Sequence, residues 1–444
     1  MDFPDLASAG VFLARLARHG VHPGLDSIGR VLSGFNDPQF SFPAVQVAGT
    51  NGKGTTAVIL AALFRSAGFR TGLFTSPHLV DVRERIQIDG QLLDPASFLT
   101  CLRDACRVQE RLGVSLTFFE MLTVVGFLAF ERASVEIAIL EVGLGGRWDA
   151  TSTARPDVSV LTSVAKDHTE ILGETLEKIL REKAAIGRAG KPFIATFPDR
   201  LMDEWSLIER QRGFLSVLRG REFDGAWASP ERSGKRSFTY QGRAEKKVFE
   251  TTLVARYQLN NLLSAMAVVE YGPWNIPDEV IASVLPTLRN PGRWERFPGF
   301  PVILDGAHNP ESMRELVEQI RETFSDPEQV GFLAGFIKGK NWEEMLGILP
   351  EAGRTFFLTA PPDTDAVDPL QLASFLGVRQ GCSFSAGQFD PMSVNAFEWS
   401  RQVPGRILVV TGSLYLVGAV KRWQSGEHSP LSAGERNVFS LFHP

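Results

Sequence analysis

The sequence is poor in the features of disulfide-rich, membrane-spanning or secreted proteins. It has three cysteines, Cys101, Cys106 and Cys382, and no two of them have the CxxC spacing of a zinc or redox site. No apolar run reaches the length that spans a bilayer, and the N-terminal residues lack the basic and apolar segments of a secretory signal. We therefore expect a cytoplasmic protein with reduced thiols.

Clusters of basic charge are also absent. The formal net charge is -5, and Lys and Arg are dispersed among Asp and Glu, so no nucleic-acid partner is expected. The 44% hydrophobic and 22% charged content is that of a globular protein. At 444 residues the chain is too long for one hydrophobic core, and two domains are expected.

Short β-branched runs alternate with helical patterns, which is typical of parallel α/β sheets. An amphipathic helix is expected first, at 12–18. The expected strands of the first part are 45–48, 71–75, 137–142, 158–162 and 193–196. Those of the second part are 302–304, 330–333, 355–359 and 407–411. Between the two parts, residues 220–249 predict β-hairpins or an exposed excursion, and 260–271 predict a helix.

Breaker residues gather after this helix, at Pro286, Asn290, Pro291, Gly292 and Pro298. They predict a larger α/β domain at 1–290, a linker at 291–298 and a smaller Rossmann-like α/β domain at 299–444. The tail after about 425 is expected to be frayed.

The strongest motif is a glycine-rich turn at 49–54 between an apolar strand and a helix expected at 55–65. Its backbone N–H groups and the helix N-terminus suit a phosphate, Lys53 adds a positive charge, and Thr55 can reach Mg²⁺. The candidate ATP-binding residues here are Gly49, Thr50, Asn51, Gly52, Lys53, Gly54, Thr55 and Thr56. The spelling GTNGKGT resembles the P-loop of the Mur ligase superfamily. This resemblance implies an ATP-binding P-loop domain of the Mur-ligase type, an ATPase domain, at 1–290. A kinase is a poor alternative, because HRD and DFG segments are missing.

Two further expected strands are followed by side chains of types that can bind metals. The carboxyl end of a strand is where α/β proteins place ligand-binding groups. Glu141 precedes the turn 143–146, and His168 follows strand 158–162. Both are candidate Mg²⁺ ligands, although Mg²⁺ prefers oxygen. Taken alone, His168 is equally well explained as a hydrogen-bonded loop histidine. Lys183, on a helix expected to start near 174, is by its local context a surface lysine.

Together these segments resemble the folylpolyglutamate synthase/dihydrofolate synthase family, a branch of the Mur ligases. The resemblance covers nearly the whole chain in the family's order. It is carried by VAGTNGKGTT at 47–56, TSPHL at 75–79, ERIQIDG at 84–90, LTFFEMLT at 116–123, LEVGLGGRWDATS at 140–152, KDHTEILG at 166–173, REKAAI at 181–186, PGRWE at 291–295, LDGAHNP at 304–310 and TGSLYLVG at 411–418.

The resemblance implies roles for individual residues. Ser76, Glu141 and His168 would bind magnesium, and Lys183 would carry a carbamate whose oxygens help to hold a second ion. Lys53, Lys183 and His308 are the catalytic candidates. Further ATP contacts would come from Asn261, Arg293 and Asp305. Substrate contacts would come from Thr117, Phe118, Phe119, Glu120 and Arg147.

Two segments depart from the family pattern. Residues 255–258 read Ala-Arg-Tyr-Gln where many relatives have G-x-H-Q. Residues 24–28 do not reproduce an isoleucine–aspartate pair seen in some bifunctional members. The choice of pterin substrate therefore stays open.

The implied reaction joins L-glutamate to a folate-type carboxylate through an acyl phosphate. It would use ATP and two Mg²⁺ ions, with a monovalent cation as a further candidate, in a monomer whose partners are small molecules. The alternatives are a ligase for a cell-wall precursor and a nucleotide-binding module without catalysis. The TFFE, REKAAI and TGSLYLVG segments disfavour the first, and the presence of Lys53, Glu141, His168 and Lys183 disfavours the second.

Overall fold

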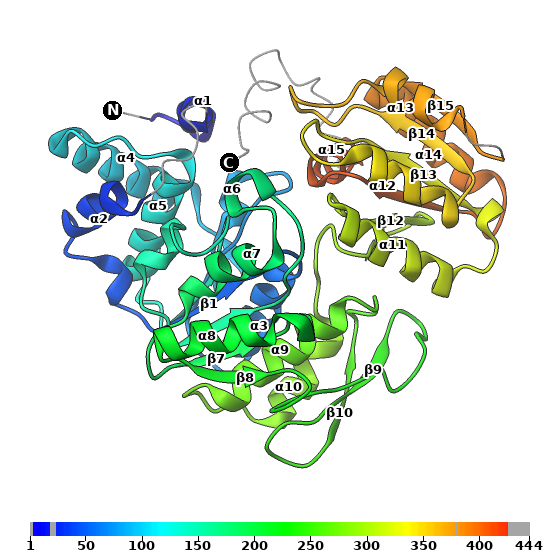
Figure 1. Ribbon diagram of the computed structural model, residues 1–444. Helices are drawn as coiled ribbons and strands as arrows, with labels where there is room; N and C mark the ends of the chain where they lie inside the picture. The colour runs from blue at the N-terminus through cyan, green and yellow to red at the C-terminus, as the bar shows by residue number, and fades with distance from the viewer. Residues whose placement is uncertain (1–2, 18–23, 379–380, 425–444) are drawn as a thin grey trace. The chain divides into compact units, whose positions relative to one another are not determined.

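The computed structural model describes residues 3–17, 24–378 and 381–424. The chain divides into two compact units, one ending at Leu288 and the other beginning at Arg289 (Figure 1). Position 18 of the first expected helix and the tail after 425 lie outside the described residues. The rest of that helix is present as α1 (Leu6–Ala17).

The first unit is built on an eight-stranded sheet in the order β4-β3-β2-β5-β1-β6-β7-β8. Its parallel strands are β1 (Ala44–Ala48), β2 (Thr71–Phe74), β5 (Ile137–Glu141), β6 (Val158–Leu161), β7 (Pro192–Ala195) and β8 (Leu215–Leu218). The antiparallel strands β3 (Ile86–Ile88) and β4 (Gln91–Leu92) extend one edge. The expected parallel sheet is confirmed, with this antiparallel edge added.

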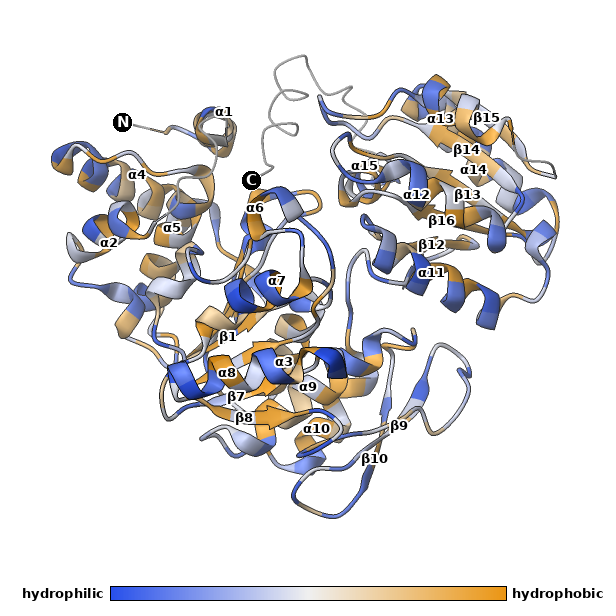
Figure 2. Ribbon diagram, in the orientation of Figure 1, coloured by the Kyte–Doolittle hydropathy of each residue, from blue (hydrophilic) through white to orange (hydrophobic). Residues whose placement is uncertain are grey.

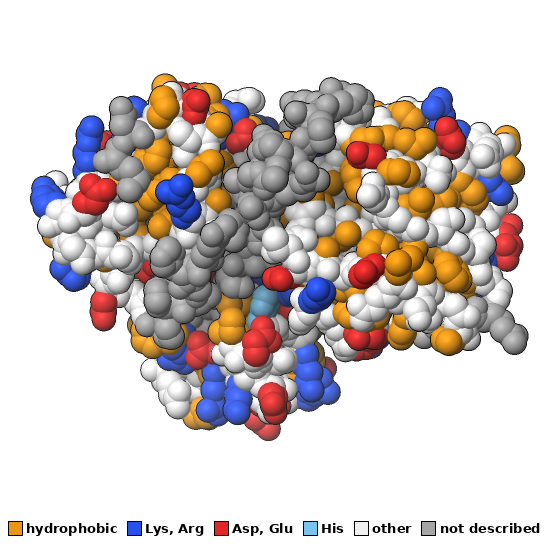
Figure 3. Space-filling view, turned by 90° about the horizontal axis from the view of Figure 1, so that it is seen from above, with side chains coloured by type: hydrophobic (Ala, Val, Ile, Leu, Met, Phe, Trp, Pro, Cys, Tyr) orange, Lys and Arg blue, Asp and Glu red, His pale blue; other side chains and the backbone are white. Residues whose placement is uncertain are grey.

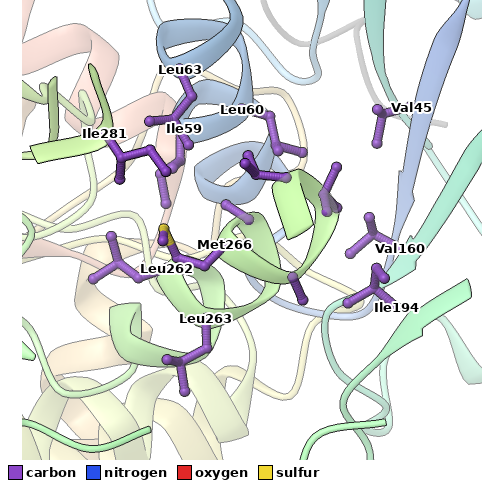
Figure 4. Packing of buried hydrophobic residues seen from close by; sticks show 14 of the residues in the cluster. Val45, Ile59, Leu60, Leu63, Val160, Ile194, Leu262, Leu263, Met266 and Ile281 are labelled. Carbon is purple, nitrogen blue, oxygen red and sulfur yellow. The ribbon is translucent and has the colours of Figure 1, made fainter. Parts of the chain in front are cut away.

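Helices cover both faces of the first sheet. One face carries α3 (Lys53–Ser66), α9 (Gln258–Tyr271) and α10 (Asp278–Val284). On the other face, β6 and β7 pack against α7 (Leu176–Lys183) and α8 (Met202–Arg212). Figure 4 shows part of the first of these cores, in which Leu60, Leu262 and Met266 belong to the same buried cluster as the strand residue Val45. Burying a side chain of this size contributes about 1.5–3 kcal/mol, so the strand that precedes the glycine turn is firmly anchored.

The remaining elements of the first unit lie around this framework. They are α2 (Asp26–Ser33), α4 (Pro95–Leu112), α5 (Phe118–Arg132), the short α6 (Thr169–Leu172) and the hairpin of β9 (Arg236–Tyr240) and β10 (Lys247–Thr251). The hairpin confirms the expected excursion.

The second unit has a six-stranded sheet in the order β11-β12-β16-β13-β14-β15. Its strands are β11 (Glu295–Arg296), β12 (Val302–Leu304), β13 (Val330–Ala334), β14 (Thr355–Thr359), β15 (Ser383–Gly387) and β16 (Ile407–Thr411). Its helices are α11 (Pro310–Thr323), α12 (Trp342–Ile348), α13 (Pro369–Leu376), α14 (Phe389–Gln402) and α15 (Leu414–Gln424). All strand pairs are parallel except β11 with β12, so the expected α/β domain is confirmed. The segment expected to be a linker, 291–298, contains β11.

The surface follows the sequence pattern. Strands such as β7 and β8 are apolar and the helices carry polar residues, whereas the strands of the β9–β10 hairpin are largely hydrophilic (Figure 2). On the face in Figure 3, basic and acidic side chains are interspersed. None of the helices in the described part of the chain has the length and apolarity needed to cross a bilayer.

Candidate active site

The glycine turn connects β1 to α3, as predicted. Gly52 has a φ of +86°, which L-residues rarely adopt. A Cβ there would lie 2.2 Å from Asn261 Oδ1, and a Cβ on Gly49 would lie 1.9 Å from Thr162 Oγ1. The turn therefore lies directly against the start of α9 and the end of β6, and Asn261 lies beside it.

We expect Gly52→Ala to weaken nucleotide binding at least tenfold. The added Cβ costs about 1–2 kcal/mol of backbone strain and also displaces Asn261 from the turn. Isothermal titration with ATP and a thermal melt would measure the two effects separately. Gly68→Ala is the matched control, because Gly68 also has a positive φ (+94°) but a Cβ added there would have no other atom within 4 Å. Equal affinities for the two variants would contradict the assignment of this turn to the nucleotide.

Hydrogen bonds to the loop after β6 fix the shape of the turn. Thr50 N donates to Ser163 O at 3.0 Å, and Asn51 N donates to Ser163 Oγ at 2.9 Å. Lys53 Nζ donates to Gly49 O and Thr50 O, both at 3.1 Å. The ammonium is thus held over the turn whose N–H groups suit a phosphate.

Glu141 lies on the neighbouring strand, β5, and reaches the same turn. It is buried, and its Oε2 accepts the backbone N–H of Ser76 at 2.8 Å. A Cβ on Gly54 would lie 3.3 Å from both carboxylate oxygens. The structure therefore brings the Glu141 carboxylate and the Ser76 backbone together beside the N-terminus of α3.

Lys183 is not the surface lysine that its local sequence suggests. It is only 4% exposed, and its Nζ donates to Gly49 O at 2.8 Å. Burial, followed by the positive charge of Lys53, lowers the pKa of Lys183 from 10.5 to about 7, against the opposing attraction of Asp167 and Asp149. Near pH 7 the buried amine is therefore neutral in a larger fraction of molecules than the amine of an exposed lysine.

His168 lies at the start of α6, after the loop that binds the turn. Its φ is +49°, its Nε2 lies 3.8 Å from Asp167 Oδ1, and its Nδ1 lies 3.7 Å from Glu170 Oε1. Within the described residues, no group of three or more His, Cys, Asp and Glu side chains is arranged to hold a metal. The predicted ligand set has a different composition, because it includes the Ser76 hydroxyl and Lys183.

The start of α5 lies against the strands that lead to these residues. The Phe119 ring packs edge-on against Phe74 at 5.7 Å, and a Cβ on Gly143 would lie 2.7 Å from it. Glu120 Oε2 accepts both the N–H and the hydroxyl of Thr117 at 2.8 Å. These two residues form a capping box, so the predicted substrate segment begins at a rigid helix terminus.

Arg147 joins the turn after β5 to the helix that carries Lys183. Its Nε donates to Glu182 Oε1 at 2.8 Å, and its backbone N–H donates to Glu182 O at 3.1 Å. A Cβ on Gly146 would lie 2.7 Å from the same carbonyl oxygen. Arg147 is thus bound to the residue that directly precedes Lys183.

Asp149 was not predicted, and it shapes this turn. It is buried and accepts the N–H groups of Gly143, Leu144 and Thr151 at 2.8, 3.1 and 2.9 Å. Burial raises the pKa of its carboxyl despite these hydrogen bonds. An aspartate shortly after a glycine-rich turn is the sequence signal that could have indicated it.

The remaining predicted residues lie in the second unit. Asp305 directly follows β12, is buried, and accepts the N–H groups of Trp294 at 2.8 Å and Ala307 at 3.0 Å. His308 Nδ1 lies 2.8 Å from Gly306 O. Since a carbonyl only accepts, Nδ1 carries the proton. Asp305 therefore joins the segment before β11, which carries Arg293, to the segment after β12, which carries His308.

Asp305→Asn is expected to destabilise the second unit by about 1–3 kcal/mol, because the amide offers one acceptor where two buried N–H groups need partners. Urea denaturation would measure the loss. Asp368→Asn is the control in the same unit. Asp368 caps α13, where asparagine is an equally good cap, so this variant should be nearly neutral. Equal stability of both variants would contradict the role given to the Asp305 carboxylate.

Family models match both units of the chain. Residues 47–269 match the Mur ligase middle domain, and residues 296–423 match the dihydrofolate synthetase C-terminal domain. The first match covers half of the chain and places the chain in the Mur ligase class.

Relatives narrow this class. The folylpolyglutamate synthase of Lacticaseibacillus casei is 30% identical over 430 residues, which cover 94% of this chain and 97% of that protein. A probable bifunctional folylpolyglutamate synthase/dihydropteroate synthase of Haloferax volcanii is 32% identical over 421 residues, 92% of this chain and 49% of that protein. The chain thus spans about half the length of this second relative. It belongs to the folylpolyglutamate synthase/dihydrofolate synthase family.

Solved structures agree with this assignment. E. coli FolC in complex with DHPP and ADP has a TM-score of 0.87 at 27% identity, covering 96% of this chain and 99% of that one. A bifunctional folylpolyglutamate synthase/dihydrofolate synthase with Mn, AMPPNP and L-glutamate bound has a TM-score of 0.82 at 29% identity, covering 95% and 98%.

Proposed function

We propose that the protein is an ATP- and Mg²⁺-dependent ligase for L-glutamate. Its acceptor would be the carboxylate of dihydropteroate, the γ-carboxylate of a reduced folate, or both. The observation that carries this proposal is the convergence of Lys53, Glu141, Lys183 and Asn261 on one glycine turn. The names and bound ligands of the relatives support it. No observation favours a ligase that acts on a cell-wall precursor. A nucleotide-binding module without catalysis would not need these four side chains to converge on one turn.

Amide formation from a carboxylate requires a leaving group. The substrate carboxylate oxygen attacks the γ-phosphorus of ATP, the bond to the β-phosphate oxygen breaks, and ADP leaves. Lys53 and the N–H groups of the turn neutralise charge on the transferred phosphoryl group. The neutral amine of L-glutamate then attacks the acyl carbon, and the carbon–oxygen bond to phosphate breaks. Thr117 to Glu120, with Arg147, would orient the acceptor.

The site is suited to divalent cations. The Ser76 hydroxyl, Glu141 and His168 would hold them, together with phosphate oxygens, and the ions would supply charge neutralisation. A carbamate on Lys183 would add two anionic oxygens. The buried Lys183 amine fits this modification, because only a neutral amine reacts with CO₂ and the pKa of Lys183 is lowered to about 7.

The finer assignments stay predictions from the family resemblance. They include the nucleotide and phosphate contacts of Arg293, Asp305 and His308, the monovalent cation, the monomeric state and the cytoplasmic location.

The test is ADP release by the purified protein with dihydropteroate or tetrahydrofolate, with and without L-glutamate. We expect release that depends on glutamate, and the two acceptors compared side by side identify the substrate. Oxygen-18 in the acceptor carboxylate should appear in released phosphate. Unlabelled phosphate would exclude the acyl phosphate, and the absence of glutamate-dependent release would exclude the ligase.

A further inference from the structure

The loop between β2 and β3, residues 75–85, has a shape that its own side chains fix. The Glu84 carboxylate accepts three successive backbone N–H groups of the loop, at 2.7 to 2.9 Å, from Leu79, Val80 and Asp81. At its start, Ser76 N donates to Glu141 Oε2 at 2.8 Å. The loop is therefore a preformed structure that is attached to the glycine turn through Glu141.

Two polar side chains of this loop are buried together. His78 is 4% exposed and Arg85 is 3% exposed, and Arg85 Nε donates to His78 Nδ1 at 2.9 Å. A guanidinium is always protonated, so Nδ1 must be the acceptor. The His78 ring is therefore neutral and carries its proton on Nε2.

The same guanidinium extends to the start of α5. Its central carbon lies 5.0 Å from the centre of the Phe118 ring, which is within the range of a cation–π contact. Phe118 is the first residue of α5 and follows the capping residue Thr117. Arg85 thus joins the loop that holds Ser76 to the helix terminus that carries the predicted acceptor-binding segment.

We propose that Arg85 and His78 are positioning residues that hold the metal side and the acceptor side of the site in one fixed arrangement. The inference rests on the proposed function, and neither residue needs to touch a reactant. His78 keeps the guanidinium turned toward Phe118, and Arg85 keeps the loop in the shape that presents Ser76 beside Glu141. Loss of the pair would let the loop and the helix terminus move independently.

The His78→Asn and His78→Leu variants separate this role from simple packing. The asparagine oxygen can accept from Arg85 Nε near the position of Nδ1, whereas leucine fills the space without an acceptor. We expect His78→Leu to raise both the KM for the acceptor and the Mg²⁺ concentration for half-maximal activity about tenfold, the effect of losing one charge-assisted hydrogen bond. His78→Asn should stay within about threefold of the wild type.

Arg85→Lys provides a second test in case His78→Leu does not fold. Lysine keeps the charge but lacks the Nε donor and the planar stacking surface, so we expect the same two parameters to rise together. Arg236→Lys is the matched control. Arg236 Nε donates to Ser229 O at 2.9 Å, and its guanidinium lies 4.4 Å from the Trp227 ring centre. This variant should lose a similar contact without changing the KM or the Mg²⁺ requirement.

The outcomes distinguish this inference from the proposed function. A wild-type protein without glutamate-dependent ADP release contradicts the function, and the inference with it. An active wild type whose His78→Leu and Arg85→Lys variants keep normal KM and Mg²⁺ dependence contradicts the inference alone. Equal defects in the His78→Asn and His78→Leu variants would also contradict the inference. The same holds if only kcat falls, in proportion to the fraction of protein that is unfolded.

Discussion

Replacing Lys53 with alanine is expected to reduce glutamate-dependent ADP release roughly 10³-fold, because the transferred γ-phosphoryl group would lose the full positive charge that Lys53 supplies at the glycine turn. Lys53 Nζ is held over the glycine turn by the carbonyl oxygens of Gly49 and Thr50. These are the carbonyls of the turn itself, so the ammonium is placed before ATP binds. Single-turnover measurement of ADP formation isolates the phosphoryl transfer step.

The fold should tolerate this substitution. Removing Lys53 also removes a positive charge that lowers the pKa of Lys183, which relieves a repulsion. Lys191→Ala is the control, since Lys191 forms a surface ion pair with Asp157 at 2.8 Å, and surface ion pairs contribute about 0–1 kcal/mol. A Lys53→Ala variant that melts normally and turns over at the wild-type rate would remove this lysine from the mechanism.

The central strands were predictable because they are covered on both faces and therefore read as continuous apolar runs. Every position of β1, β5 and β13 is buried. For the nine strands that were predicted, the observed ends lie within one residue of the expected ones. Periodicity and β-branching were sufficient for these elements.

The edge strands were not predicted, because they are only partly buried and therefore lack the continuous apolar run of the central strands. The first three residues of β15 are exposed, and both residues of β4 are exposed. β8 begins with an exposed leucine. Their strand conformation depends on pairing with β14, β3 and β7, which is tertiary information that the local sequence does not contain.

The same distinction, between local sequence pattern and tertiary contacts, applies to the residues of the candidate active site. Glu141 could be predicted, because the carboxyl end of a parallel strand is where α/β proteins place ligand-binding groups. The environment of Lys183 could not, because its Nζ meets a carbonyl 134 positions earlier in the chain. Only the family resemblance singled it out. His78, Arg85 and Asp149 were missed for a different reason. The hydrogen-bond partners given above for them lie within seven residues along the chain, but their burial is not visible in loop segments that read as polar.

Lys183→Ala is expected to reduce ligation about 10²–10³-fold, because the site loses the group proposed to hold the second ion near the transferred phosphoryl group. A short carboxylate such as acetate should restore part of the activity, since it can supply the oxygens of the missing carbamate. Lys178→Ala, on the exposed side of the same helix, is the control and should have wild-type activity with or without acetate.

The pH dependence provides an independent measurement. The unmodified amine has a pKa of about 7 in the folded protein and 10.5 in the unfolded chain, so between these values the unfolded chain binds more protons. Stability therefore rises with pH across this window when Lys183 is unmodified, and Lys183→Ala should abolish that slope. Uptake of ¹³C-bicarbonate should also increase as pH rises through about 7, because only the neutral amine reacts. If wild-type protein takes up no label and acetate restores nothing, the carbamate is excluded, and Lys183 must act as an amine.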